Sequence, residues 1–576
     1  MTERNGDIRN DEPALIGVGL ELDRLEASDR DQEIPPSTEG YFAKVADDGK
    51  QEELAEKTDI PPNANGDGTS VVNSSSETES IESSSLNDNA FNIVGWDGDG
   101  DPEHPYNWPA WQTRLNCGLI NIANFIAPLG STIFAPAVPQ VVLEFNNDSP
   151  ELAAFVVSVD ILGFAFGPLL MAPLSEMYGR VKIYHVCNFG FLAATIACAV
   201  APNMDSLIVF RLLSGIFGSC FGTTGAGSIT DMVPPEKRAG VMAVSAAGSL
   251  LGPIVGPIVG GFITAAWGWR WTQWVVAIAS GVLSILILFT FRESYHPILL
   301  ERKTARLRKE TGNLSLKSKY DLGLSAADYF KRSIIRPLKL LVRSPIVTLS
   351  ALFISISYAI LFLMFTSMTT VFQEHYRFST STVGLAFIGL GVGSILGVAI
   401  YAITSDRYLR KKAAKFEAAS EQNTTTETNT TTVSPTARAQ GIQPEHRLLH
   451  LPFGSMMLPV GLLIYGWTIQ YRVHWVVPIM ATSLIAAGNI LVYMSLQMFL
   501  VDSFTIYSAS ALAAMTVLRS IAAALLPLSG LKLYDSLGIG WGNSLLAFIS
   551  LLFIPVALVI KRFGAHLRKK FEIKTL

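Results

Sequence analysis

The sequence predicts an all-α integral membrane protein whose twelve transmembrane helices form two related halves of six. Three observations support this fold class: the composition, the number of long apolar segments and an internal repeat. Of the 576 residues 49% are hydrophobic and 16% are charged, and the mean hydropathy is +0.35. Soluble domains carry about 25% charged residues. The composition therefore excludes an ordinary soluble protein.

Twelve apolar segments have the length of about 20 residues that a helix needs to cross a bilayer. They lie at 115–137, 152–174, 183–201, 206–228, 240–265, 270–291, 346–371, 382–403, 451–470, 475–499, 508–531 and 543–561. The long polar gap 292–344 divides them six and six. We therefore expect a disordered cytosolic N-terminal tail (1–105), a first six-helix half (106–291), a cytosolic central loop (292–344), a second half (345–562) that contains a cytosolic low-complexity loop (404–450), and a basic cytosolic tail (563–576).

Two polar regions are interpreted from composition alone. The tail 1–105 is acidic and rich in serine, and it has too little apolar surface to offset the entropy of ordering. In the central loop, Glu301 to Glu310 reads ERKTARLRKE, dense in both charges. Such a segment either lies as a helix in the membrane interface or is a solvated charged helix, and the sequence does not choose between the two.

Basic residues set the expected orientation. The connections assigned to one side carry thirty Lys and Arg, against four on the other side. By the positive-inside rule both termini then lie in the cytosol. The sequon Asn147-Asp148-Ser149 falls on the outer side, so Asn147 is a glycosylation candidate, although the following Pro150 disfavours its use.

The internal repeat pairs the second apolar segment with the eighth. In each, two glycines four residues apart precede a serine, an acidic residue and an arginine, and the serine follows the second glycine by eight residues. The offset between the copies is 230 residues for the glycines, the serine and the acidic residue. The two sets are Gly163, Gly167, Ser175, Glu176 and Arg180, and Gly393, Gly397, Ser405, Asp406 and Arg407. Two homologous halves are the construction of many secondary transporters.

The fifth segment carries a glycine stripe, GSLLGPIVGPIVGG, that ends at Gly261. Its glycines recur every four residues and share one helix face, along which another helix can pack closely. They are Gly248, Gly252, Gly256 and Gly260. Pro253 and Pro257 lie beside the stripe and bend the helix, which stays helical because unpaired backbone groups in lipid cost several kcal/mol. A simple packing helix of any membrane protein is the alternative.

Several motifs in order give a family resemblance. GPLLMAPLSEMYGRVKIY (167–184), RLLSGIFGS (211–219), the glycine-stripe segment (248–261) and SASALAAMTVLRS (508–520) occur in sequence. With them, residues 100 to 562 resemble the major facilitator superfamily, and within it the fungal twelve-helix drug:proton antiporter group of multidrug and polyamine exporters. The resemblance implies the major facilitator fold and alternating access between the halves. We expect the glycine stripe to pack against the other half.

The resemblance also implies a cytosolic gate. Glu176, Arg180 and Asp231 would form a charge relay that latches the halves, with Asp406 and Arg407 as the counterpart in the second half. The alternative is an ordinary solvated salt bridge.

Two charges interrupt apolar runs, which makes them functional candidates. Asp160 lies in the second segment and Arg211 in the fourth. We expect Asp160 to carry the exchanged proton with Arg211 as its electrostatic partner. The alternatives are a substrate contact for Asp160 and a structural role for Arg211.

From the family, the first, fourth, seventh and tenth helices line the cavity. The candidates are polar or aromatic: Asn121, Asn124, Phe125, Tyr358, Asn489, Tyr493 and Gln497. Such side chains suit an amphipathic or weakly basic organic substrate, although each could be a satisfied intramembrane polar group. Arg519, in the eleventh helix, is expected to brace the interface between halves.

The sequence therefore predicts a monomeric, multi-pass plasma-membrane antiporter that exports a small organic compound against proton entry. Lipid, protons and the substrate are the expected partners, with no nucleic acid. The proton gradient is the energy source, and no cofactor, metal or nucleotide is expected, since no GxxxxGK[ST] motif occurs. An enzyme is disfavoured. Proton-coupled uptake and a transporter-shaped nutrient sensor are the rival functions.

Overall fold

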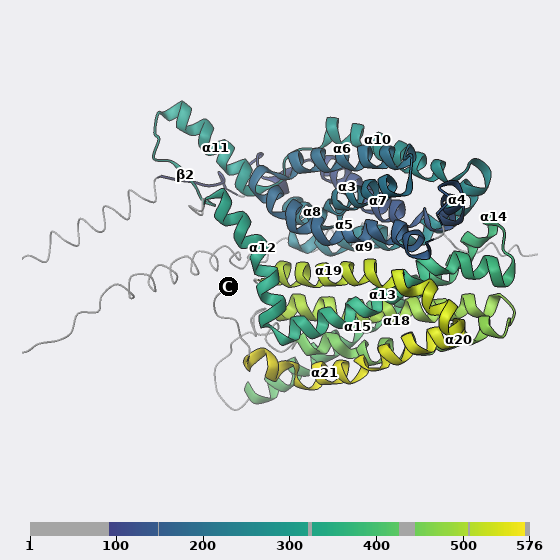
Figure 1. Ribbon diagram of the computed structural model, residues 1–576. Helices are drawn as coiled ribbons and strands as arrows, with labels where there is room; N and C mark the ends of the chain where they lie inside the picture. The colour runs from purple at the N-terminus through teal and green to yellow at the C-terminus, as the bar shows by residue number, and fades with distance from the viewer. Residues whose placement is uncertain are drawn as a thin grey trace, which may run out of the picture. The chain divides into compact units, whose positions relative to one another are not determined.

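The computed structural model describes residues 92–570, apart from Asp99, Asp148, 321–324, 425–443 and 505–506. Almost all of this part is helical (Figure 1). The first 91 residues, and with them most of the expected N-terminal tail, lie outside the described residues.

The first half contains six passes. Helix α5 begins at Pro150 because the Ser149 side chain accepts a hydrogen bond from the Leu152 amide and Pro suits the first helical position. The helices of this half are α3 (Ala110–Thr132) continued by α4 (Val138–Glu144), α5 (Pro150–Tyr178), α6 (Arg180–Ala199), α7 (Met204–Gly218) continued by α8 (Cys220–Met232), α9 (Pro235–Trp267) and α10 (Trp269–Thr290).

The second half repeats this arrangement. Its helices are α13 (Pro345–Tyr376), α14 (Thr380–Val383) followed by α15 (Ile388–Thr424), α17 (Leu451–Gln470), α18 (Val476–Ser503), α19 (Ser508–Leu525), α20 (Gly530–Leu551) and α21 (Phe553–Lys570). Among the described residues, eleven helical stretches are long and apolar enough to cross a membrane. The last of them, Ser508–Gly564, is 57 residues long, and Gly538 breaks it with φ +77°. Only glycine adopts this conformation readily. The stretch therefore holds two passes, which gives twelve.

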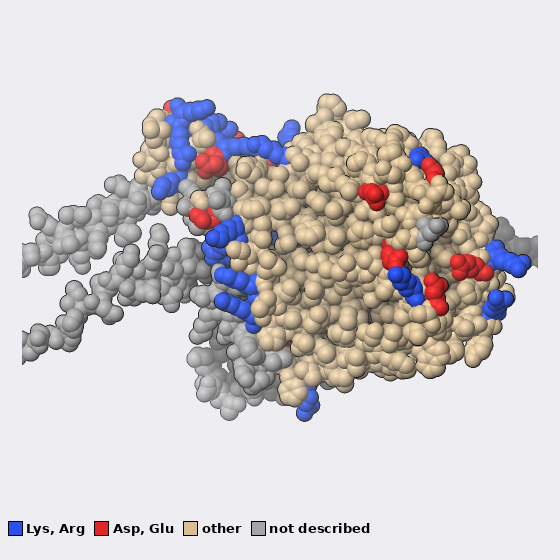
Figure 2. All heavy atoms as spheres, in the orientation of Figure 1, with Lys and Arg blue, Asp and Glu red and all other residues tan. Residues whose placement is uncertain are grey.

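The central loop contains two helices, α11 (His296–Thr311) and α12 (Ala326–Arg343). Lys and Arg gather at the end of the protein that carries them, whereas the adjoining face is mostly uncharged (Figure 2). We call this end the basic end.

The hydrophobic cores of the two halves are joined only in part. Away from the basic end, one cluster of buried side chains contains residues of both halves, among them Phe134, Val156 and Phe387. Toward the basic end, Tyr184 and Phe291 belong to a cluster made of the first half alone. A separate cluster there is made of the second half. The halves are thus packed into one core at the opposite end.

Two expected boundaries change. The loop expected at 404–450 begins as a continuation of α15, which stays helical to Thr424. In the tail expected to be disordered to residue 105, Ile93–Val94 forms strand β1, which pairs in parallel with β2 (Lys317–Ser318). The expectations missed both because the charged residues after 404 are good helix formers and because β1 needs a partner far along the chain.

The glycine stripe packs within its own half, so the expected contact with the other half is wrong. A Cβ on Gly252 would lie 2.7 Å from the Phe125 carbonyl oxygen, and one on Gly260 would lie 2.0 Å from that of Ile133. Both partners belong to the first pass. The neighbouring face reaches the second half instead, since Gly261 faces Gly384. Periodicity predicted the close packing, but it carries no information about which helix is the partner.

We expect Gly252→Ala to lower the stability of the purified protein by about 2 kcal/mol, because the added methyl group meets backbone atoms that cannot move aside. Gly281→Ala in α10 is the matched control, since its Cβ would meet only Leu192 methyl groups at 3.7 Å. Thermal unfolding in detergent measures both. Equal melting temperatures for the two variants would show that the contact is loose.

Candidate functional site

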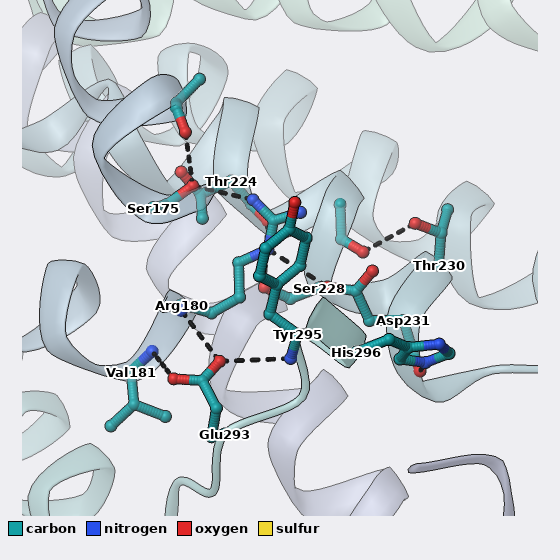
Figure 3. Close-up of polar contacts among 12 residues, drawn as sticks. Ser175, Arg180, Val181, Thr224, Ser228, Thr230, Asp231, Glu293, Tyr295 and His296 are labelled. Carbon is teal, nitrogen blue, oxygen red and sulfur yellow. Dashed lines mark hydrogen bonds and ion pairs between the residues drawn. The ribbon is translucent and has the colours of Figure 1, made fainter. Parts of the chain in front are cut away.

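Arg180 begins α6 at the basic end and is nearly buried, with 6% of its surface exposed. Its Nε donates to Asp231 Oδ2 at 3.1 Å and its Nη1 donates to Ser175 Oγ at 2.7 Å. The turn from α5 to α6 is made by Gly179 with φ +98°. The structure therefore brings together Arg180 and Asp231, two of the three residues expected in the gate (Figure 3).

Glu293 holds this turn in place. Its carboxylate accepts hydrogen bonds from the Arg180 and Val181 amides, at 2.9 and 3.3 Å. These are unpaired donors at the start of α6, where a negative charge is also favoured by the helix dipole. A Cβ at Gly179 would lie 2.3 Å from Glu293 Oε2, so the glycine is required by space as well as by conformation.

The residues that follow Glu293 cover the ion pair. The Tyr295 ring lies across the Arg180 guanidinium, with 4.6 Å between ring centroid and Cζ. His296 Nε2 is 2.9 Å from the Asp231 carbonyl oxygen. Burial, followed by the charge of Glu176, raises the pKa of Tyr295 above its usual value. Tyr295 therefore stays neutral and shields the pair from water.

Glu176 is not bonded to Arg180. Its carboxylate accepts a hydrogen bond from the Tyr329 hydroxyl of α12. Glu176 thus connects the first half to the central loop, whereas the relay expected from the sequence joined it directly to Arg180. Burial and then Glu176 raise the pKa of Tyr329, which keeps the hydroxyl a donor.

The structure describes only part of the gate expected in the second half, which consists of Asp406 and Arg407. Arg407 is exposed on α15, and the side chain of Asp406 lies outside the described residues. The expected relay there stays a prediction.

A strap formed by residues 92–107 lies against α11. Lys303, which is 5% exposed, donates to Asp101 Oδ2 at 2.9 Å and pairs with Asp97 at 2.8 Å. The Tyr106 hydroxyl donates to the Thr230 carbonyl oxygen at 3.3 Å, next to Asp231. Because Lys303 and Thr304 are buried while most of 301–310 is exposed, α11 is held by the strap along one side, and its placement in the interface or in water stays a prediction.

The charges of the strap are tuned by this contact. Although burial acts to raise it, hydrogen bonds from the Asp97 amide and from Lys303 lower the pKa of Asp101 to about 2. Burial acts to lower the pKa of Lys303, but Asp97 and Asp101 raise it. Both groups are therefore charged over the whole physiological range.

Asp160 and Arg211 are both buried inside the first half, with 3% and 1% exposed. Ser214 Oγ lies 2.6 Å from Asp160 Oδ1. Arg211 donates to the Ser131 carbonyl oxygen at 2.8 Å and lies over the Phe134 ring. The two charges are thus neighbours across Ser214 without the direct ion pair that the expected partnership suggests.

The cavity candidates fall into two groups. In the first half, Asn124 is buried and donates to Ser245 Oγ at 2.7 Å, while Asn121 and Phe125 are half-buried. In the second half, the Arg519 guanidinium lies 4.4 Å from the centroid of the Tyr358 ring and 5.3 Å from that of Tyr493.

Arg519 therefore contacts two cavity candidates of its own half. Its helix α19 also packs on α5 of the first half, and the expected role of Arg519 in bracing the interface stays a prediction. Of the remaining candidates, Asn489 is buried and Gln497 is half-buried on α18. Asn147 accepts a hydrogen bond from the Ser149 amide at 2.8 Å, in the turn before α5, and its glycosylation stays a prediction.

The chain that forms this twelve-pass fold matches a known family. A model of the Major Facilitator Superfamily matches residues 120–527. The chain belongs to the major facilitator superfamily. It is therefore a multi-pass membrane transporter of this superfamily.

Fungal members of the superfamily are similar over most of this chain. The chain is 47% identical to the MFS-type transporter tndD of Aspergillus flavipes over 85% of its own length and 87% of the relative. It is 43% identical to the efflux pump radE of Floropilus chiversii over 84% and 86% of the two chains. These matches support the resemblance to the fungal drug-transporter group.

A solved structure supports the fold alone. The xylose transporter XylE of E. coli, in a partially occluded inward open conformation, superimposes with a TM-score of 0.54 at 14% identity. The match covers 79% of this chain and 98% of XylE.

Sequence reasoning missed the partners that the central loop supplies to the site: Glu293, Tyr295, His296, Lys303 and Tyr329. All lie in the central loop, outside the apolar segments and the repeat. A signal for Glu293 existed, since a carboxylate just after the sixth apolar segment lies at the same end as the start of α6. Nothing in the pattern distinguishes Tyr329 from other loop aromatic residues.

We expect Asp231→Asn to reduce both transport and stability, the latter by about 3 kcal/mol, because it leaves the buried Arg180 charge unpaired. Asp502→Asn is the matched control. Its ion pair with Arg447 is 2.8 Å long, but its side chains are 32% and 27% exposed, and such pairs contribute about 0–1 kcal/mol. Unfolding in detergent and transport in liposomes measure the difference, and equal losses would contradict the assigned burial.

The strap should stay docked at neutral pH and detach in acid. Because docking lowers the pKa of Asp101, this residue stabilises the docked strap fully at any pH above its usual pKa of 3.8. The stabilisation is lost as the pH falls through about 2. The raised pKa of Lys303 adds a contribution that is complete below 10.5 and is lost above it.

Amide hydrogen exchange at Lys317 and Lys319 measures this docking, since these amides donate to Asn92 and Val94 in the strap. We expect constant protection from about pH 5 to pH 9 and its loss in Lys303→Ala. The control Arg306→Ala removes an ion pair whose side chains are about half exposed and should keep the protection. A change in amide protection near neutral pH would refute the assignment of Asp101 and Lys303 as the groups that hold the strap.

Proposed function

We propose that this transporter is a proton-coupled antiporter, which exports a small organic compound across the plasma membrane by alternating access with both termini in the cytosol. The observation that carries the proposal is Asp160, a carboxyl group buried in the middle of a membrane-spanning helix. A relative named as an efflux pump supports the direction of transport. The excess of Lys and Arg at the basic end supports its cytosolic location.

Asp160 suits reversible protonation. Its charged form accepts a hydrogen bond from the Ser214 hydroxyl, and the nearby Arg211 guanidinium supplies positive potential without closing an ion pair. A carboxylate locked in such a pair would hold its charge, whereas one stabilised at a distance can accept a proton when its surroundings change. Proton uptake and release would then follow the movement of the halves.

Contacts at the opposite end define what must break for the cavity to open outward. Ser158 of α5 donates to the Ala524 carbonyl oxygen at 2.9 Å, and Thr369 of α13 donates to that of Ala135 at 3.3 Å. Both bonds join the two halves beside their shared core. We assign this arrangement to the state closed on the outside, with the gate around Arg180 holding the cytosolic ends of α5, α6 and α8 together.

The substrate we propose carries an aromatic or apolar body and a hydrogen-bond acceptor or negative charge. Arg519 places a cation between Tyr358 and Tyr493, and its Nε is buried without a hydrogen-bond partner. A weakly basic substrate, which the polar side chains alone suggested, would be repelled by this charge. An acceptor-bearing aromatic compound would satisfy the guanidinium and stack on the rings.

The test is efflux from proteoliposomes across a panel of organic compounds, with and without an imposed pH gradient. We expect gradient-driven movement by the wild type and its loss in Asp160→Asn, because an amide cannot accept the proton. The control Asp205→Asn makes the same change at an exposed position at the start of α7 and should transport normally. All variants are checked for folding by their elution profile in detergent.

The rival functions give different results in this assay. Accumulation on the side that is losing protons indicates export by exchange, whereas movement together with protons indicates uptake. Movement that ignores the gradient, or an Asp160→Asn protein with an unchanged pH profile, would exclude proton coupling through Asp160. A protein that binds compounds from the panel but moves none would favour the sensor.

A further inference from the structure

Helix α12 presents a row of basic side chains that the transport site does not use. Lys331, Arg332, Arg336, Lys339 and Arg343 recur at helical spacing, so they share one side of the helix. All are exposed except Arg336, which is half-buried. The row lies at the basic end, where Figure 2 shows Lys and Arg gathered along the edge of the described protein.

The protein does not neutralise this row. Within the described residues, none of the five has a carboxylate within 4.0 Å. Asp328 lines the same hollow as Lys331, Arg332, Arg336 and Lys339, but it is bonded to Ser325, whose hydroxyl donates to it at 2.6 Å. Arg336 Nε is buried without a hydrogen-bond partner. The four cations outnumber the one carboxylate in the lining of this hollow, and its net positive charge suits an anion.

Apolar side chains beside the row indicate what kind of anion. Leu338 and Val342 are 44% and 83% exposed, and their helical positions place them next to Lys331. The other side of α12 is held by buried Pro337 and Leu340, where the helix packs on α13, α19 and α5. A fixed helix that exposes basic and apolar residues together is typical of an interfacial helix.

The position along the chain sets the depth in the membrane. α12 ends at Arg343, and the membrane-spanning α13 begins at Pro345. The exposed apolar residues therefore lie within a turn or two of the level at which the chain enters the bilayer. The basic side chains lie at the level of the lipid headgroups, where each Lys or Arg near an anionic surface strengthens binding.

We propose that α12 is a binding site for the headgroup phosphate of an anionic phospholipid, with Lys331, Arg332, Arg336 and Lys339 as its cationic ligands and Leu338 and Val342 against the acyl chains. The exposed apolar pair selects a lipid over a free phosphate. Because Tyr329 in the first turn of the same helix bonds Glu176, an occupied site steadies the helix that contacts the gate. The site is independent of the direction of transport and of proton coupling.

The test is a titration of the full-length protein in detergent with a fluorescent short-chain phosphatidylserine, followed by anisotropy. We expect saturable binding that weakens about thirtyfold in the double variant K331Q/K339Q, since each lysine near the headgroup contributes about one kcal/mol. The matched control K309Q/K317Q removes two exposed lysines of the same end, on and after α11. It should bind within about twofold of the wild type.

Three further results bear on the assignment. V342S should also weaken binding, because it removes the apolar contact without changing the charge. Equal affinity for phosphatidylserine and for phosphatidylcholine with the same chains would overturn the proposal. Displacement of the probe by inorganic phosphate at similar concentrations would show a free-phosphate site instead. Equal losses of affinity in the two double variants would show that binding depends on the net charge of this end and not on a site at α12.

Discussion

One buried guanidinium determines how the basic end of the first half is built. Arg180 has little contact with water, so its charge must be matched by the protein. Asp231 supplies the counter-charge from the end of the fourth pass, and Glu293 fixes the Arg180 amide from the segment after the sixth. The ends of three passes are therefore held in register around one side chain, and Tyr295 excludes water from the pair.

The sequence predicted the fold well because hydrophobic length and charge asymmetry are local properties. It also predicted the Arg180–Asp231 pair, since the family resemblance implied a role for both residues. The partners of charged groups in the central loop could not be predicted in the same way. In the sequence Lys303 does not differ from the other lysines of the loop. Its burial depends on a strand pairing between Ile93 and Lys317, which no periodic pattern in the sequence predicts.

The glycine stripe shows the same limit within the membrane. A four-residue period specifies a smooth helix face, and many neighbours can use such a face. The structure places Gly252 and Gly260 against the first pass, while Pro257 and Ile258 approach Gly384 of the second half. α9 is thus joined to its own half by close backbone contact along its length. It meets the other half over a shorter stretch, which suits a helix on which one half turns against the other.

The strap has a consequence for the order in which the protein assembles. β1 precedes the first transmembrane helix, but its partner β2 follows the sixth. During synthesis Lys303, which binds Asp97 and Asp101 of the strap, and β2 are both made after the sixth pass, so these contacts cannot form until all of the first half has been made. The strap therefore closes over a completed six-helix unit, so that the earliest described segment of the chain is among the last parts of that unit to fold.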